Sequence, residues 1–185
     1  MRLQQVSPLR NGRRLFSPID LTVEPGSISV LMGPSGIGKS SLLDSISGGL
    51  DYTGIIDVPG KCFRVYQDHN QLFPWMTVRR NLGLANPESD WNHILGRWQL
   101  DGFLDRYPTV CSVGQQQRIT LLRAIHSDKP VLLCDEPLSG VDRKTAASIL
   151  DFFLSEIQHT SKRVIWVTHN RDEALHLGNI IEIKS

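Results

Sequence analysis

The chain has 185 residues and a formal net charge of +1, and 40% of its residues are hydrophobic and 21% charged. These values fit a single globular domain and exclude an intrinsically disordered chain. The near-neutral net charge does not favour nucleic-acid binding, which usually needs a strongly basic surface. No apolar run approaches the ~18 residues of a membrane span, and we expect no apolar secretion leader at the N-terminus.

A glycine-rich loop between a predicted strand and a predicted helix is the first informative element along the chain. The apolar run Ile28–Met32 predicts a buried strand, and the periodic segment Lys39–Ser47 predicts a helix. Residues 33–40 read Gly-Pro-Ser-Gly-Ile-Gly-Lys-Ser and fit the pattern G-x-x-x-x-G-K-[ST]. In such a loop, inward-turned N–H groups and the positive helix end bind the phosphates of a nucleoside triphosphate. A chance match to a glycine-rich turn would not explain the flanking strand and helix.

Two side chains of this loop predict specific chemistry. Lys39 would neutralise charge on the β- and γ-phosphates, and the Ser40 hydroxyl would ligate Mg²⁺. The residues expected to contact the nucleotide here are Gly33, Pro34, Ser35, Gly36, Ile37, Gly38, Lys39, Ser40 and Ser41.

The middle of the chain turns from strand-like to helix-like patterns. Helices are predicted over Thr77–Leu84, Trp91–Trp98 and Val113–Ile125. Ahead of them, Leu72–Met76 is unusually apolar for a loop. Its side chains either pack a small helical subdomain or are exposed as a docking patch, and we expect a mixture of the two.

Two carboxylates end the next predicted strand. Val131–Cys134 predicts a buried parallel strand, followed by Asp135 and Glu136 at the edge where ligands bind in such sheets. Asp135 would hold Mg²⁺ directly or through water, and Glu136 would polarise an attacking water. Val164–Thr168 predicts another strand that ends at His169, and the alternation of strand and helix after residue 131 argues for a parallel sheet.

In this order, the motifs resemble those of the ATP-binding cassette (ABC) ATPases, the nucleotide-binding subunits of ABC transporters. The resemblance spans residues 3–183 or so. It implies an α/β fold: a P-loop NTPase with a mainly parallel central sheet, a trimmed antiparallel β-region and an inserted α-helical subdomain. We expect one domain over 1–185, with the core in 1–71 and 126–185 and the helical signature subdomain in 72–125.

The resemblance also implies roles for polar residues that the motifs alone leave ambiguous. Gln67 would help to hold Mg²⁺ and would sense both the metal and the membrane partner. The catalytic residues would be Gln67, Glu136 and His169, of which His169 would contact the γ-phosphate. Taken singly, Gln67 and His169 would be ordinary polar residues at strand ends. Asp142 would lie in the loop that communicates between two cassettes and would also cap the following helix.

The signature motif is assigned to Ser112-Val113-Gly114-Gln115, and it contains a departure from the family pattern. Ser112, Gly114 and Gln115 are expected to contact nucleotide held by a second copy. The family usually has two glycines where this chain has Val113-Gly114. A β-branched side chain is bulkier than glycine and is poor at positive φ, so the geometry at the opposite γ-phosphate is affected.

Arg10 is a second departure, because it stands where an aromatic residue usually stacks on adenine. Its guanidinium plane either stacks on the base or faces solvent in the loop 7–14.

The function implied is that of an ATP-binding and ATP-hydrolysing subunit of an ABC transporter, of a short importer-like form. It would dimerise head to tail around two MgATP and drive transport by transmembrane subunits. Its location would be cytoplasmic, on the inner face of the membrane through those partners. The alternative is a nucleotide-gated clamp with little turnover, which Val113 favours and Glu136 opposes. The solute is not encoded here, because membrane and binding subunits select it.

Overall fold

The computed structural model describes residues 1–67 and 71–184. Within these residues, the central sheet has five strands in the order β6-β7-β8-β4-β9, and every pair of neighbours is parallel. Its strands are β4 (Ser27–Met32), β6 (Cys62–Val65), β7 (Val131–Asp135), β8 (Arg163–Val167) and β9 (Ile180–Glu182). The predicted parallel core is therefore confirmed.

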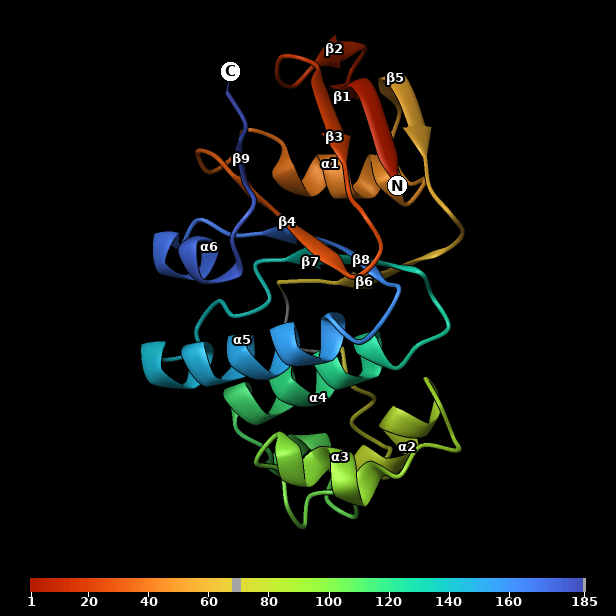
Figure 1. Ribbon diagram of the computed structural model, residues 1–185, viewed down its shortest axis with the longest axis vertical. Coiled ribbons are helices and arrows are strands. Elements are labelled where there is room, and N and C mark those ends of the chain that lie inside the picture. Colours follow the sequence, from red (N-terminus) through yellow and green to blue (C-terminus); the bar gives the residue numbers. More distant parts are fainter. Residues whose placement is uncertain (68–70, 185) are drawn as a thin grey trace.

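Both faces of this sheet are covered by helices (Figure 1). The long helices are α1 (Lys39–Ile46), α4 (Val113–Ile125) and α5 (Arg143–Ile157), and the short α6 (Arg171–Leu177) follows β8. Because side chains alternate along a strand, Leu31 and Leu133 pack with α1 on one face, while Leu132 and Trp166 pack with α4 and α5 on the other. The chain thus builds two apolar cores, one on each side of the sheet.

A smaller antiparallel sheet lies over α1 (Figure 1). It consists of β1 (Arg2–Arg10), β2 (Arg13–Arg14), β3 (Ile19–Thr22) and β5 (Tyr52–Asp57), with β2, β3 and β5 all paired to β1. This is the predicted antiparallel β-region in its short form.

The helical subdomain lies beyond α4, on the side away from the sheet (Figure 1). It contains α2 (Val78–Gly83), α3 (Trp91–Arg97) and a 3₁₀ turn, η1 (Pro108–Val110). Trp91 and Trp98 are buried in it, and the Trp98 ring stacks on Phe152 of α5 at 5.8 Å. This contact joins the subdomain to the sheet-covering helices.

The predicted elements agree with the observed ones to within one residue at nearly every end. Thr77, for example, precedes α2 and accepts a hydrogen bond from the Arg80 N–H, so it caps the helix that was expected to begin there. In the part of the chain that the structure describes, no helix is long and apolar enough to cross a membrane.

Candidate active site

Neighbouring strands of the central sheet bring the predicted catalytic and binding residues to one edge. Gly33 follows β4, Gln67 lies two residues after β6, Asp135 ends β7, and His169 lies two residues after β8. Val167 pairs with both Leu31 and Asp135 in register, so the carboxyl ends of β4, β7 and β8 are level. This is the edge at which open parallel sheets bind ligands.

The glycine-rich loop between β4 and α1 has the conformation expected of a phosphate-binding loop. Gly36 and Gly38 have positive φ angles of 77° and 115°, which side chains rarely adopt. A Cβ at Gly38 would also lie 3.0 Å from Leu15 Cδ1. The buried Lys39 donates from Nζ to the carbonyls of Gly33 (2.8 Å) and Pro34 (3.0 Å). The loop therefore places a lysine charge and a helix N-terminus together.

Asp135 lies beside the start of α1. Burial raises the pKa of its carboxyl group, while a hydrogen bond with the Ser40 side chain and the nearby charge of Arg64 oppose that rise. Carboxylate and hydroxyl oxygens are the ligands that Mg²⁺ prefers. Among the described residues no cluster of three or more His, Cys, Asp or Glu forms a metal site of its own. The carboxylate of Asp135 and the hydroxyl of Ser40 therefore fit a Mg²⁺ ion that is bound together with the phosphates of a nucleotide.

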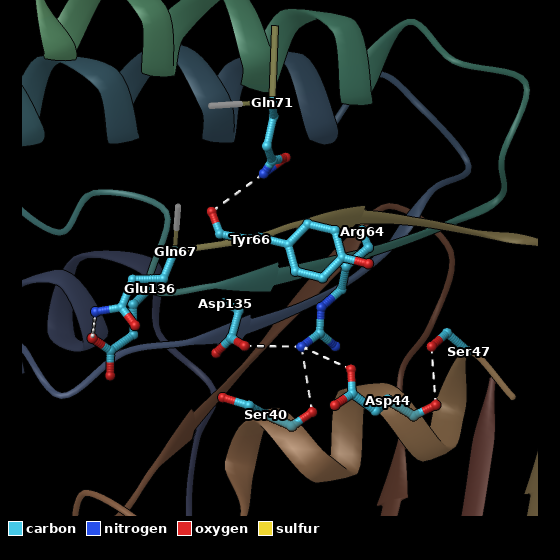
Figure 2. Close-up of polar contacts among 9 residues, drawn as sticks. All are labelled: Ser40, Asp44, Ser47, Arg64, Tyr66, Gln67, Gln71, Asp135 and Glu136. Atoms are coloured by element: carbon cyan, nitrogen blue, oxygen red, sulfur yellow. Dashed lines mark hydrogen bonds and ion pairs between the residues drawn. The ribbon is translucent and has the colours of Figure 1, made fainter. Parts of the chain in front are cut away.

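Glu136 is held in an unusual backbone conformation next to Asp135. Its φ is +45°, in the left-handed region that costs a non-glycine residue about 1–3 kcal/mol. Its N–H donates to the Val167 carbonyl at 2.9 Å. Its Oε2 accepts a hydrogen bond from Gln67 Nε2 at 3.3 Å (Figure 2) and lies 2.9 Å from His169 Nδ1. The structure thus brings together the three residues predicted to be catalytic.

The signature motif opens α4 with a capping box. Ser112 Oγ accepts from the Gln115 N–H at 3.3 Å, and Gln115 Oε1 accepts from the Ser112 N–H at 2.8 Å. Gly114 packs closely against α5, because a Cβ there would lie 3.2 Å from Thr145 Cγ2 and that methyl group would have to shift by a few tenths of an ångström. Val113 is the first helical residue, so the objection that it would need positive φ does not apply; its side chain is nevertheless exposed.

The structure does not bring the signature and the phosphate-binding loop together. α1 and α4 lie on opposite faces of the central sheet (Figure 1), and their apolar residues belong to different cores. Ser112, Gly114 and Gln115 are therefore separated from Lys39 within one chain.

Two further predicted residues are placed at turns. Asp142 accepts a hydrogen bond from the Thr145 N–H at 3.0 Å, which confirms it as the N-cap of α5. Arg10 is exposed at the end of β1, where Asn11 and Gly12 reverse the chain with positive φ. Its stacking on adenine stays a prediction.

The apolar segment 72–76 divides between core and surface. Leu72 is buried, whereas Phe73 and Trp75 are 38% and 68% exposed, with ring centroids 5.4 Å apart. A cavity of about 260 Å³ next to Phe73 is also lined by Leu84 and Arg123. The expected mixture of packing and exposed side chains is present.

Arg64 is a site residue that the sequence analysis did not single out. It lies in β6, and its Nη2 is 2.8 Å from Asp135 Oδ2. The available signal was a single cation inside the otherwise apolar strand Cys62–Val65.

Comparison with known proteins gives a consistent family assignment. A family model described as ABC transporter matches residues 16–139. The chain is 36% identical over 174 residues to the aliphatic sulfonates import ATP-binding protein SsuB 1 of Pseudomonas savastanoi pv. phaseolicola, covering 91% of this chain and 73% of that protein. It is 33% identical over 192 residues to SsuB of Bacillus subtilis, covering 95% and 75%.

Solved structures show the same fold at lower identity. An ABC transporter ATP-binding protein from Pyrococcus furiosus superposes with a TM-score of 0.83 at 20% identity, covering 98% of this chain and 96% of that one. A chain from an inward-facing metal-chelate type ABC transporter gives a TM-score of 0.81 at 23% identity, covering 98% and 78%.

Proposed function

Because this chain belongs to the ABC transporter family, as an ATP-binding ATPase subunit of the importer type, we propose that two copies close head to tail around two MgATP molecules. The observation that carries this proposal is the separation of α1 and α4 on opposite faces of the sheet. Each signature is then free to complete the site of the other copy. ATP hydrolysis in these closed sites drives the transmembrane subunits.

The chain's own residues divide the chemistry between binding and proton transfer. Residues 33–41 bind the phosphates through backbone N–H groups, and the Lys39 ammonium turns from the loop carbonyls to the phosphate oxygens. Glu136 accepts a proton from the attacking water. Gln67 and His169 fix the Glu136 carboxylate, and His169 donates to the γ-phosphate when the carboxylate releases it. Most of the catalysis is positioning and charge stabilisation.

Magnesium fits the oxygen-rich side of this site. Ser40, Asp135 and Gln67 would hold it, directly or through water, and it would neutralise charge on the β- and γ-phosphates. The Ser40 side chain lies close enough to the Asp135 carboxyl group to oppose the rise of its pKa, so two of these ligands lie together.

Val113 provides the prediction that tests whether the departure in the signature motif slows turnover. Its exposed side chain stands at the start of α4, where the proposed dimer brings the opposite γ-phosphate. If its bulk holds the two copies apart, Val113→Gly should raise the rate of phosphate release severalfold and strengthen dimerisation. Glycine near a helix end costs less than the ~1 kcal/mol of an interior position, so the helix should persist.

The measurement for Val113 is phosphate release as a function of protein concentration. Activity per chain should rise with concentration for both proteins, and Ser112→Arg, which breaks the signature, should abolish that rise. A Val113→Gly protein no faster than the parent would reject the crowding explanation and leave the ATPase assignment intact.

Phe73 and Trp75 form the surface that we propose for the transmembrane subunits, and this contact would place the protein on the inner face of the membrane. Both rings are exposed on the helical side of the molecule, and Phe73 lines a cavity, as a groove for a short helix requires. Trp75→Ala should weaken assembly with membrane subunits by roughly 30-fold, the effect of losing an aromatic hot spot.

The Trp75 variant should keep the ATP affinity of the parent. Assembly is measured by co-purification of the membrane-spanning subunits in detergent. Tyr52→Ala, which removes an exposed ring from the antiparallel sheet, is the matched control and should assemble normally. Normal assembly of Trp75→Ala would place the docking surface elsewhere.

A further inference from the structure

A guanidinium is built into the side of the predicted magnesium site. Arg64 extends from β6 between the end of β7 and the first turns of α1 (Figure 2). Its Nη2 lies 2.8 Å from Asp135 Oδ2, 3.4 Å from Asp44 Oδ1 and 3.3 Å from the Ser40 carbonyl oxygen. The same nitrogen therefore contacts the predicted metal carboxylate and the backbone of the predicted metal hydroxyl residue.

This cluster is screened from solvent. The side chains of Arg64 and Asp135 are only 8% and 10% exposed, whereas Asp44 is 47% exposed. The Tyr66 ring lies over the guanidinium, 5.3 Å from its Cζ, on the side away from α1 (Figure 2). An arginine stays charged under all ordinary conditions, so a fixed positive charge acts on Asp135 through a medium that screens it weakly.

Arg64 is tied to the site by one nitrogen only. Its Nε and Nη1 are buried and find no hydrogen-bond partner among the residues that the structure describes. A purely structural arginine would be expected to use more of its five N–H donors. The contacts that hold it are instead concentrated on the acidic groups at the metal site.

A cation at Asp135 would share that carboxylate with Arg64. Resting on the proposed function, we infer that Arg64 is a fixed counter-charge that lowers the affinity of the Asp135 site for the divalent cation. Repulsion between like charges weakens metal binding, and the ion pair withdraws Asp135 Oδ2 from the metal. The residue thereby sets how strongly nucleotide binding depends on the metal.

A positioning role for Arg64 would give the opposite sign. If the guanidinium only orients Asp135 for the metal, its removal should weaken metal binding, as loss of an orienting neighbour does in other metal sites. The direction of the change therefore distinguishes the two roles.

The test is the Mn²⁺ affinity of the full chain saturated with a non-hydrolysable ATP analogue, measured from free Mn²⁺ by electron paramagnetic resonance. Arg64→Met should bind Mn²⁺ about tenfold more tightly than the parent, since one unit of positive charge beside a dication is removed. Arg64→Lys keeps the charge and should stay close to the parent. Unchanged or weaker Mn²⁺ binding by a folded Arg64→Met would overturn the inference.

Arg64→Gln decides the question if Arg64→Met does not fold. It removes the positive charge and keeps a polar side chain beside Asp135, so it should also bind Mn²⁺ about tenfold more tightly than the parent. Unchanged or weaker Mn²⁺ binding by Arg64→Gln would contradict the counter-charge role. Binding of the analogue in the presence of Mg²⁺ is measured first in the parent: its absence would refute the nucleotide site itself, whereas binding with the wrong Mn²⁺ response refutes only the role of Arg64.

Discussion

Glu136→Gln is expected to bind ATP with the affinity of the parent and to release phosphate about 10²–10⁴-fold more slowly, the contribution typical of a general base. The amide keeps the shape of the side chain and its contact with Gln67, but it does not accept a proton from water. The closed dimer should then persist, because hydrolysis is the step that reopens it.

Phosphate release and size-exclusion chromatography with ATP measure the two effects of Glu136→Gln. A variant of an exposed carboxylate, Glu88→Gln, is the control and should behave as the parent. Parental turnover in Glu136→Gln would show that another group is the base.

Lys39→Ala is expected to reduce MgATP affinity on the order of 30-fold or more, because truncating one partner of a buried charge pair costs about 2–5 kcal/mol. Lys39 is buried in the loop and donates to two loop carbonyls, so its ammonium is already positioned where phosphates bind. Every other residue of the loop 33–40 is neutral, so no second loop cation replaces Lys39.

Isothermal titration calorimetry with MgATP measures the Lys39 effect. Lys144→Ala removes an exposed lysine from α5 and should leave the affinity unchanged. Because alanine at 39 also removes loop hydrogen bonds, thermal unfolding is recorded alongside. Unchanged MgATP affinity in a folded Lys39→Ala protein would contradict the assignment of the loop.

The elements predicted correctly are those whose sequence pattern lies within one short stretch of the chain. The loop at Gly33–Ser40 lies between a continuous apolar run and a periodic helix, and both patterns are complete within about 20 residues. Asp135 and Glu136 were placed correctly because a buried parallel strand reads as an apolar run that stops at its polar end.

The role of Arg64 could not be predicted from the local sequence pattern, because its contacts are made by residues distant in the chain. Its contacts come from Ser40 and Asp44 in α1 and from Asp135 in β7, which are 20 or more residues away in the chain and adjacent only in the folded sheet. A cation in a strand is otherwise expected to face solvent. Only the position of β6 next to β7 turns it toward the acidic groups.

The backbone conformation at two positions likewise could not be predicted from the sequence. The left-handed φ of Glu136 goes together with an N–H bond to the Val167 carbonyl of β8, a partner that is distant in the sequence. Val113 was expected to be strained because the family usually has a glycine there, and a β-branched residue is poor at the positive φ that glycine tolerates. Ser112 proves to be the cap, which makes Val113 an ordinary first helical residue.

Completion of each hydrolytic site by a second copy is the central claim, and mixing two inactive variants tests it most directly. Glu136→Gln retains its signature, and Ser112→Arg retains its Glu136, so a mixed dimer contains one site with both groups intact. An equimolar mixture should release phosphate at about a quarter of the parent rate, since half of randomly formed dimers are mixed and each has one intact site of two. A mixture no more active than the two variants measured separately would contradict the shared site.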